Sequence, residues 1–176
     1  MEAADQPVQT ADALHGVRVI EMGQLIAGPF CGKTLGEFGA EVIKIEAPAD
    51  RSQPGSTGGD PLRNWRLIKE GTSVWWQVQS RNKRSVALDL RQPEAQDIVR
   101  RLAAEADVLI ENFRPGALES WGLGPDEPLA ANPRLVVLRI SGYGQTGPYR
   151  DRPGFGVVAE AMGGLRHLTG EPGRVP

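Results

Sequence analysis

Residues 111–116, of sequence ENFRPG, combine three residue types that suit the rim of a ligand site. Asn112 supplies an amide, Phe113 an aromatic ring and Arg114 a guanidinium group. The ring could stack on a base or cover a pantetheine-like arm, and the guanidinium could bind a phosphate through a fork of hydrogen bonds. A capped strand end with a solvated arginine would use the same residues, so the run alone does not decide between the two interpretations.

Basic residues flank the segment SVALDL at positions 85–90. They are Arg81, Lys83, Arg84 and Arg91. On a chain with a formal net charge of −2, they predict a local positive patch that could receive phosphate groups. The alternative is a solvated sheet edge, because scattered surface charges contribute little to binding or stability.

Other candidate side chains lie in the second half of the chain. Tyr143 is part of the glycine-rich run SGYGQTGP, where a backbone could approach a ligand closely and a phenol could donate a hydrogen bond; a plain turn is the alternative. His167 follows an apolar segment without an evident carboxylate partner, so we interpret it as structural or exposed. We expect Trp75 and Trp76 to belong to the core.

The spacing of glycines, cysteines and histidines argues against two nucleotide-binding motifs and a metal site. Residues 27–34, AGPFCGKT, match a degenerate phosphate loop, but Pro29 has no N–H to offer and no apolar strand ends in the aspartate that would organise magnesium. A P-loop NTPase is therefore disfavoured. The run GQLIAG lacks the G-x-G-x-x-G spacing of dinucleotide enzymes. Cys31 is the one cysteine and only two histidines are present, so no metal site is expected.

Alternating strand and helix patterns must position these residues. We expect strands near 17–22, 41–46, 85–90, 107–112 and 135–141, and helices over 31–39, over 93–106 and after Gly154. On the helix over 93–106, the residues expected on the buried face are Ala95, Ile98, Val99, Leu102 and Ala106. Residues 47–72 are rich in proline and glycine, so little regular structure is expected there.

This alternation predicts an α/β fold with a Rossmann-like, open and mostly parallel sheet with flanking helices. Ligands of such sheets bind at the carboxyl ends of the strands, near the point where the strand order reverses. The segments that leave strands are GQLIAGP, LRQ, ENFRPG and SGYGQTGP, whereas Lys83 and Arg84 enter a strand from its other end. The first four segments are therefore the candidate site.

Composition excludes several classes of protein. The chain has 176 residues, with 20 lysine and arginine residues against 22 aspartate and glutamate residues, so it lacks the basic field that nucleic acid requires. No apolar run approaches the ~20 residues of a membrane helix. Residues 1–15 lack the pattern of a secretory signal and are interpreted as a flexible arm. A cytoplasmic, reducing location is expected.

Five strings in the same order carry a resemblance to a known family. They resemble the family III CoA-transferases, the group that includes formyl-CoA transferase, carnitine CoA-transferase and α-methylacyl-CoA racemase. The match runs from Gly16 to the last residue. The strings are GVRVIEMGQLIAGPFCGKTLGEFGAEVIKIE, NKRSVALDL, DVLIENFRPGALESWGL, NPRLVVLRISGYGQTGP and RPGFGVVAEAMGGLRHLTGEP.

The resemblance implies an activity, a domain and partners. Residues 16–176 would be the amino-terminal part of a CoA-binding large domain, with the remainder of the fold absent from this chain. The complete form would be an interlinked homodimer that moves CoA from an acyl-CoA to a small carboxylic acid. Coenzyme A would be a substrate, and no tightly bound cofactor is implied.

The resemblance also assigns site residues. The CoA positions carried over by the motifs are Leu25, Leu88, Arg91, Asn112 and Phe113, with Arg84 and Arg114 as further candidates. Ile26 and Tyr143 would line the acyl site.

Departures from the family pattern limit what this chain can do alone. The family's nucleophilic aspartate is expected beyond Pro176, and neither Glu160 nor Glu171 matches its position. Phe155 and Gly156 replace the His-Asp pair of the racemase branch, which disfavours a racemase. Ala47 stands where some members carry a CoA-contacting arginine. The alternative to a CoA-transferase is a non-catalytic protein, a CoA-binding or interaction module without turnover.

Overall fold

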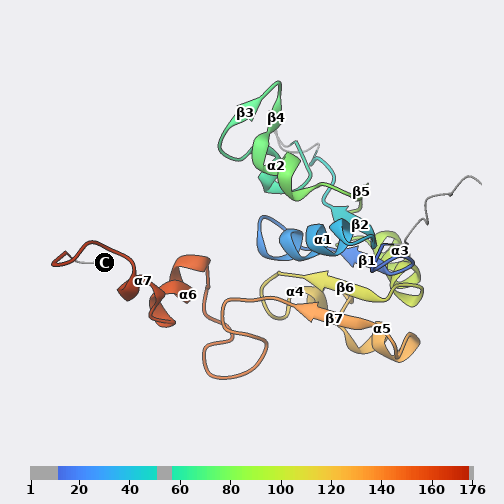
Figure 1. Cartoon of the computed structure of the whole chain (residues 1–176). Helices are drawn as coiled ribbons and strands as arrows, with labels where there is room; N and C mark the ends of the chain where they lie inside the picture. The colour runs from blue at the N-terminus through green and yellow to red at the C-terminus, as the bar shows by residue number, and fades with distance from the viewer. Residues whose placement is uncertain (1–11, 51–56, 175–176) are drawn as a thin grey trace, which may run out of the picture.

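The computed structural model describes residues 12–50 and 57–174 (Figure 1). Its strands are β1 (Arg18–Glu21), β2 (Glu41–Glu46), β3 (Ile68–Lys69), β4 (Thr72–Ser73), β5 (Lys83–Ala87), β6 (Val108–Glu111) and β7 (Val136–Arg139). Its helices are α1 (Ala27–Glu37), the 3-10 helix η1 (Pro61–Asn64), α2 (Val74–Gln79), α3 (Pro93–Ala104), α4 (Ala117–Ser120), α5 (Asp126–Ala131), α6 (Gly156–Met162) and α7 (Leu165–Leu168).

Five strands form one parallel sheet in the order β5-β2-β1-β6-β7. Pairs such as Ile20 with Ile43 and Ile20 with Leu109 fix the register of the central strands. The central strands β1, β2 and β6 are mostly buried, in keeping with their β-branched and leucine residues, whereas the edge strands β5 and β7 are largely exposed. The predicted α/β class and mostly parallel sheet are confirmed.

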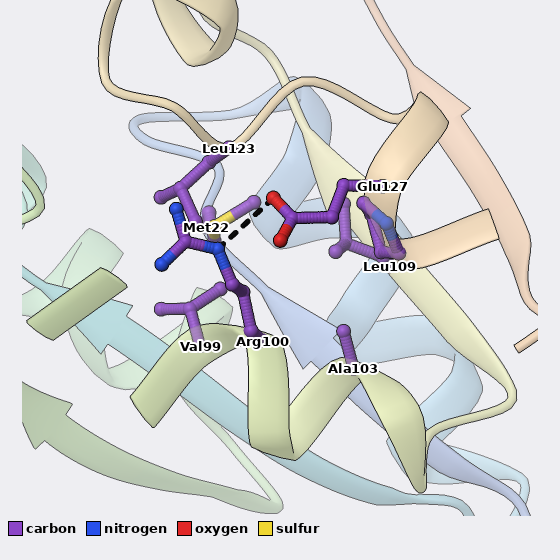
Figure 2. Close-up of a pocket in the computed structure, with 8 residues that line it drawn as sticks. Met22, Val99, Arg100, Ala103, Leu109, Leu123 and Glu127 are labelled. Carbon is purple, nitrogen blue, oxygen red and sulfur yellow. Dashed lines mark hydrogen bonds and ion pairs between the residues drawn. The ribbon is translucent and has the colours of Figure 1, made fainter. Parts of the chain in front are cut away.

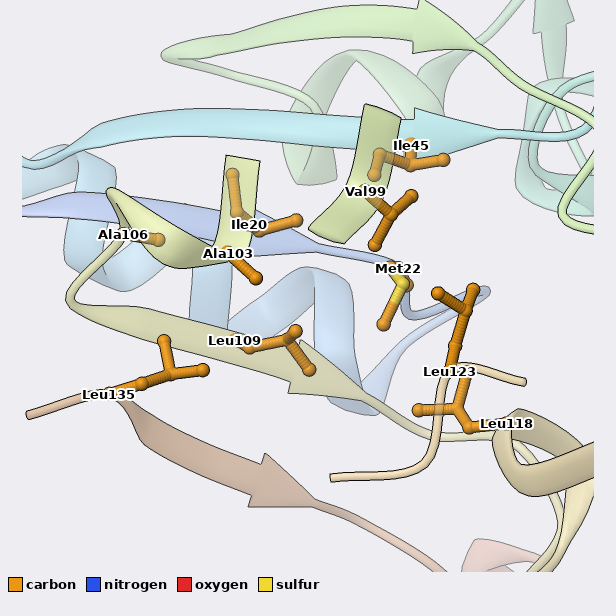
Figure 3. Close-up of a cluster of buried hydrophobic side chains, with 10 residues drawn as sticks. All are labelled: Ile20, Met22, Ile45, Val99, Ala103, Ala106, Leu109, Leu118, Leu123 and Leu135. Atoms are coloured by element: carbon orange, nitrogen blue, oxygen red, sulfur yellow. The ribbon is translucent and has the colours of Figure 1, made fainter. Parts of the chain in front are cut away.

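Each face of the sheet has its own apolar core. On one face, α3 packs over Ile20, Ile45 and Leu109 through Val99 and Ala103, as Figure 3 shows. On the other face, Val19, Val42 and Ile110 pack with partly buried side chains of α1, including Cys31 and Leu35. Burial of β1 and β6 on both faces makes these two strands the rigid centre of the fold.

The buried face of α3 differs from the sequence prediction at Ile98. Ala95, Val99 and Ala103 are buried, four residues apart, whereas Ile98 is 39% exposed and Leu102 is only partly buried. Ala106 is also buried and Leu102 packs against the same core, so the contact follows these positions and leaves Ile98 outside it. The prediction that Ile98 is buried is wrong.

A pair of truncations on α3 tests this packing. Val99→Ala is expected to lower the free energy of unfolding by about 2 kcal/mol, because it removes two buried methyl groups and leaves a cavity. Ile98→Ala is expected to cost less than about 1 kcal/mol, because that side chain is already half in water. Urea unfolding of both variants measures the difference, and equal losses would contradict the assigned face.

The stretch 47–72, where little regular structure is expected, contains η1, β3 and the start of β4, and α2 follows it. Ser73 caps α2 by accepting from the Trp76 N–H at 3.3 Å, so the WW segment is helical. Trp75 is 39% exposed and packs edge-on against Trp65, with ring centroids 5.9 Å apart. The prediction that Trp75 belongs to the core is therefore wrong. Helix α2 lies beside the two-stranded β3–β4 sheet, away from the five-stranded sheet (Figure 1).

The two ends of the described chain differ in packing. Residues 12–15, part of the expected flexible arm, form a turn in which the Leu14 N–H donates to the Phe38 carbonyl oxygen at 2.8 Å; residues 1–11 lie outside the described ranges. After β7 the chain leaves the sheet and forms α6 and α7, broken at Gly164 with a φ of 80° (Figure 1). Neither helix has a buried residue, and His167 is exposed. Within the described ranges, every helix is too short or too polar to span a bilayer.

Candidate functional site

The order of the strands reverses between β1 and β6. From β1 the chain adds β2 and then β5 on one side, and it returns to add β6 and β7 on the other. The loops that follow β1 and β6 therefore lie side by side at the carboxyl edge, where parallel sheets bind ligands. Residues 23–26 form the first of these loops, the β1 loop, and residues 112–116 form the second, the β6 loop.

Asn112 joins the two loops. Its Oδ1 accepts from the Gln24 N–H at 2.6 Å, and its Nδ2 donates to the Gln24 carbonyl oxygen at 2.8 Å. Close approach requires small residues here: a Cβ on Gly23 would lie 2.9 Å from the Gly28 Cα. The Asn112 side chain thus binds the backbone of Gln24, the neighbour of Leu25, and this brings the two predicted CoA residues Leu25 and Asn112 together.

The β6 loop is also held by a buried carboxylate that the sequence analysis did not single out. Glu111 is fully buried, accepts from the Phe113 N–H at 2.7 Å and pairs with Arg139 at 2.7 Å. The Phe113 ring packs edge-on against Trp121, with centroids 5.2 Å apart. The Phe113 backbone and ring are therefore both held in place, whereas Arg114 is exposed.

Beneath the β1 loop lies a buried group of charged side chains, which we call the charge cluster: Glu21, Lys44, Glu46, Asp60 and Lys83. The Lys44 Nζ lies 2.9 Å from Glu21 and 3.0 Å from Asp60. The Lys83 Nζ lies 2.7 Å from the other oxygen of Glu21, and burial lowers the pKa of this lysine. Four of these side chains come from β1, β2 and β5, and Asp60 comes from the segment between β2 and β5.

The charge cluster also explains a glycine in α1. A Cβ on Gly32 would lie 1.9 Å from a carboxylate oxygen of Glu21, so only glycine lets the helix pass over this residue. Residues 27–34, the degenerate phosphate-loop match, start α1 at Ala27 instead of forming an open loop of N–H groups. The structure therefore gives no support to an NTPase.

Hydrogen bonds hold Glu46 of the charge cluster in its charged form. Although burial acts to raise its pKa, hydrogen bonds from Arg63, Ser85 and the Asp60 backbone outweigh burial and lower the pKa to about 2. Both Arg63 contacts are 2.7 Å long. Glu46 thus ties the segment after β2 to the end of β2.

A pH dependence follows from this carboxylate. Because the pKa of Glu46 is lower in the folded protein than its ordinary value of 4.5, its contribution to stability is complete above pH 4.5 and is lost as pH falls from there toward 2. Glu46→Gln is expected to flatten the fall in unfolding free energy between pH 5 and pH 3. Urea titrations at both pH values measure it, with exposed Glu70→Gln as the control. A slope as steep as that of the wild type would contradict the assignment.

The expected positive patch is neutralised in the structure. Lys83 is buried in the charge cluster, Arg81 pairs with Glu37, Arg84 pairs with Glu41 at 2.9 Å, and Arg91 pairs with Asp89 at 2.8 Å. Each of these four cations thus has a carboxylate partner within the fold, so the segment carries separate ion pairs and not an uncompensated positive patch.

The other predicted site residues are spread along the sheet. Leu88 and Arg91 follow β5, at the carboxyl edge but two strands away from β1. Arg84 sits near the start of β5, toward the opposite end of the strand. Tyr143 follows the edge strand β7, and its hydroxyl lies 3.5 Å from the Met162 sulfur. The structure thus brings together Leu25, Ile26, Asn112 and Phe113, and it leaves Arg84 and Tyr143 apart from them.

Two hollows are lined by residues outside the β1 and β6 loops. One, between α3 and α5, has a volume of about 10 Å³ and is covered by the Arg100–Glu127 ion pair of 3.0 Å (Figure 2), so it holds at most one water molecule. The other is an open groove of about 580 Å³ at the amino ends of β1, β2 and β5. Arg18 and Arg84, its two arginines, both pair with Glu41, which lowers its attraction for anions.

Carboxylates near the carboxyl terminus are exposed. Glu160 lies 3.8 Å from Arg166 and Glu171 lies 3.5 Å from Arg174, on segments that do not pack on the sheet. Among the described residues, no group of three or more acidic, histidine or cysteine side chains has the geometry to hold a metal ion.

Comparison with known proteins defines the family. The profile of CoA-transferase family III matches residues 14–176. The chain is 54% identical to the succinyl-CoA–D-citramalate CoA-transferase of Chloroflexus aurantiacus, over 93% of this chain and 39% of that protein. It is 40% identical to human succinyl-CoA:glutarate CoA-transferase, over 89% of this chain and 34% of that protein. A solved CAIB/BAIF family protein from Brucella suis superposes with a TM-score of 0.84 at 41% identity, covering 95% of this chain and 43% of that chain.

The fold, the loops at the reversal point and the profile match agree, and the chain belongs to CoA-transferase family III. It spans about two fifths of the length of the relatives it matches. The described residues thus correspond to an amino-terminal portion of such relatives.

Proposed function

We propose that the complete protein transfers CoA from succinyl-CoA to a small dicarboxylic acid. The observation that carries this proposal is the 54% identity with a succinyl-CoA–D-citramalate CoA-transferase across both candidate loops. Relatives named for L-malate and glutarate as acceptors, at 51% and 40% identity, support the same donor and a short dicarboxylic acceptor. Citramalate, malate and glutarate are therefore the acceptors to test.

The candidate loops would bind the thioester substrate. Leu25 and Ile26 would contact the adenine side of CoA and the acyl group, and Asn112 and Phe113 would line the opposite wall. Their support is the direct hydrogen bonding of Asn112 to the β1 loop and the fixed ring of Phe113. Leu88 with Arg91 would extend the CoA site along the sheet edge, and Tyr143 would face the acyl end from β7.

The bond-making step would use a carboxylate nucleophile outside residues 1–176. That carboxylate attacks the thioester carbonyl, the CoA thiolate leaves, and an acyl anhydride forms. The thiolate then attacks the enzyme carbonyl of the anhydride, which releases succinate and leaves an enzyme thioester. The acceptor carboxylate and the returning thiolate repeat the two steps in reverse, so no water and no redox partner is consumed.

The complete protein would work as an assembly of two related subunits. Two relatives of this chain are named as the α and β subunits of a succinyl-CoA–L-malate CoA-transferase, and these names support an assembly of subunits. Family resemblance adds the expectation of an interlinked homodimer. A mass measured by light scattering at twice that of one complete subunit supports the dimer, and a single-subunit mass contradicts it.

A transfer assay tests the proposed function. The complete protein is incubated with succinyl-CoA and each acceptor, and mass spectrometry measures the new acyl-CoA and free CoA. We expect one acceptor thioester for each succinate formed, without net thiol release. Binding of CoA without any transfer would instead support the non-catalytic CoA-binding module, and release of free CoA would identify a thioesterase.

A further inference from the structure

The β1 loop contains a residue in an unusual backbone conformation. Leu25 has a φ of 60°, in the left-handed region that a residue with a Cβ rarely adopts. The loop therefore does not hold its shape by local preference. Contacts from outside the loop must therefore hold Leu25 in this conformation, and two side chains form hydrogen bonds to the loop backbone.

One anchor is Asn112, described above, which fixes Gln24 from the β6 side. The second is Asp60, whose two carboxylate oxygens accept from the Leu25 N–H at 3.0 and 3.1 Å. Asp60 is 35 residues further along the chain and belongs to the segment between β2 and β5. The strained residue of the β1 loop is thus held by a side chain from a different part of the sequence.

Asp60 is built into the protein interior. It is 1% exposed, and its charge is compensated by the Lys44 Nζ at 3.0 Å. The Lys44 Nζ also donates to the Gly23 carbonyl oxygen at 2.7 Å, so the same cation reaches the other end of the loop. The Asp60 N–H donates to Glu46 at 2.7 Å, which fixes the carboxylate relative to β2.

From these contacts we infer that Asp60 is a positioning residue for acyl-CoA: its buried carboxylate, oriented by Lys44 and Glu46, holds Leu25 and Ile26 in the geometry that receives the substrate. Asp60 acts through the Leu25 N–H and does not touch the reacting atoms. The role in substrate binding rests on the proposed function, whereas the effect on the loop does not.

Asp60→Asn is the informative substitution because it keeps the shape and removes the charge. In Asn, one of the two oxygens becomes an N–H₂ group. This group must face either the Lys44 ammonium or the backbone N–H donors of Leu25 and Leu62, and it cannot accept from any of them. The matched control is Asp97→Asn on α3, where the carboxylate is exposed and pairs with Arg100.

Two readouts on the complete protein test the inference. In hydrogen exchange without ligand, the amides of Gln24 and Leu25 are expected to exchange about tenfold faster in Asp60→Asn than in the wild type, with the central strands unchanged. In the transfer assay, the KM for succinyl-CoA is expected to rise about tenfold, more than kcat falls per folded molecule. The control is expected to match the wild type in both readouts.

The outcomes separate this inference from the proposed function. Unchanged exchange in residues 23–26, or a lower yield of folded enzyme with an unaltered KM, overturns the positioning role. If the wild-type protein shows no CoA transfer but the loop amides still exchange faster in Asp60→Asn, the anchoring role of Asp60 is upheld and the proposed function is refuted. If Asp60→Asn does not fold, Asp60→Ser replaces it, because the shorter serine side chain can cap only the Leu62 N–H. Fast exchange of the Leu25 amide in the wild-type protein would overturn the inference without any variant.

Discussion

Replacing Lys44 with methionine is expected to lower the free energy of unfolding by roughly 3 to 5 kcal/mol, because it removes one partner of a buried set of charges. The Lys44 side chain is 1% exposed and its Nζ lies 2.9 Å from Glu21 and 3.0 Å from Asp60, which are themselves inaccessible to water. Methionine fills the same space without charge, so the loss measures uncompensated carboxylates and not a cavity. Urea unfolding with two probes measures it.

A lysine outside the cluster provides the control. Lys69 lies on the exposed strand β3, and Lys69→Met is expected to change the free energy of unfolding by less than about 0.5 kcal/mol. Similar small effects for both variants would mean that the ion pairs of Lys44 are not formed in solution, and would contradict the charge cluster as a structural unit.

Asn112→Ala is expected to raise the KM for succinyl-CoA by about ten- to thirtyfold in the complete protein. Truncation removes both hydrogen bonds to Gln24, each contributing about 1 kcal/mol, and together these correspond to about thirtyfold in binding. It also frees the β1 loop from the β6 loop at the reversal point of the sheet. Steady-state rates at varied succinyl-CoA measure the effect.

Asn132 offers a matched control for this truncation. Its amide is buried and donates to the Ala103 and Ala106 carbonyl oxygens at 3.2 and 2.8 Å, on the α3 side of the sheet. Asn132→Ala is expected to lower stability while leaving the KM for succinyl-CoA as it is. A rise in KM of equal size in both variants would show that Asn112 acts through general stability, and the assigned site would be wrong.

The fold is predictable from the sequence because local patterns determine it. Short apolar runs rich in β-branched residues identify the five strands of the parallel sheet, and Pro93 at the start of a helical pattern identifies α3. The rule that parallel sheets bind ligands at their carboxyl ends then selects the β1 and β6 loops. These steps need only spacing and residue type.

The contacts that hold the site depend on register, which spacing does not reveal. Lys44 meets Glu21 because the two residues are direct partners in the parallel pairing of β1 with β2. Asp60 reaches Leu25 only because the segment after β2 folds back over the sheet edge. The one available signal was the occurrence of Glu21, Lys44 and Glu46 inside buried strands, where unpaired charges are too costly to occur.

Charge counting along the sequence failed for the same reason. Arg81 and Arg84 lie near each other in the chain and predict a positive patch, but their partners Glu37 and Glu41 come from α1 and β2. Long-range pairing therefore converts a run of cations into a set of separate ion pairs. Exposure of Ile98 and Trp75 follows similarly from the tertiary arrangement of α3 and α2.

A crystal structure of the complete protein with bound CoA would test the central claim most directly, namely that substrate binds at the carboxyl edge where the β1 and β6 loops meet. The expected result is CoA in contact with Leu25 and Ile26 on one side and with Asn112 and Phe113 on the other, with the Asp60–Leu25 hydrogen bond intact. CoA bound in the open groove at the amino ends of β1, β2 and β5, beside Arg18, would contradict it.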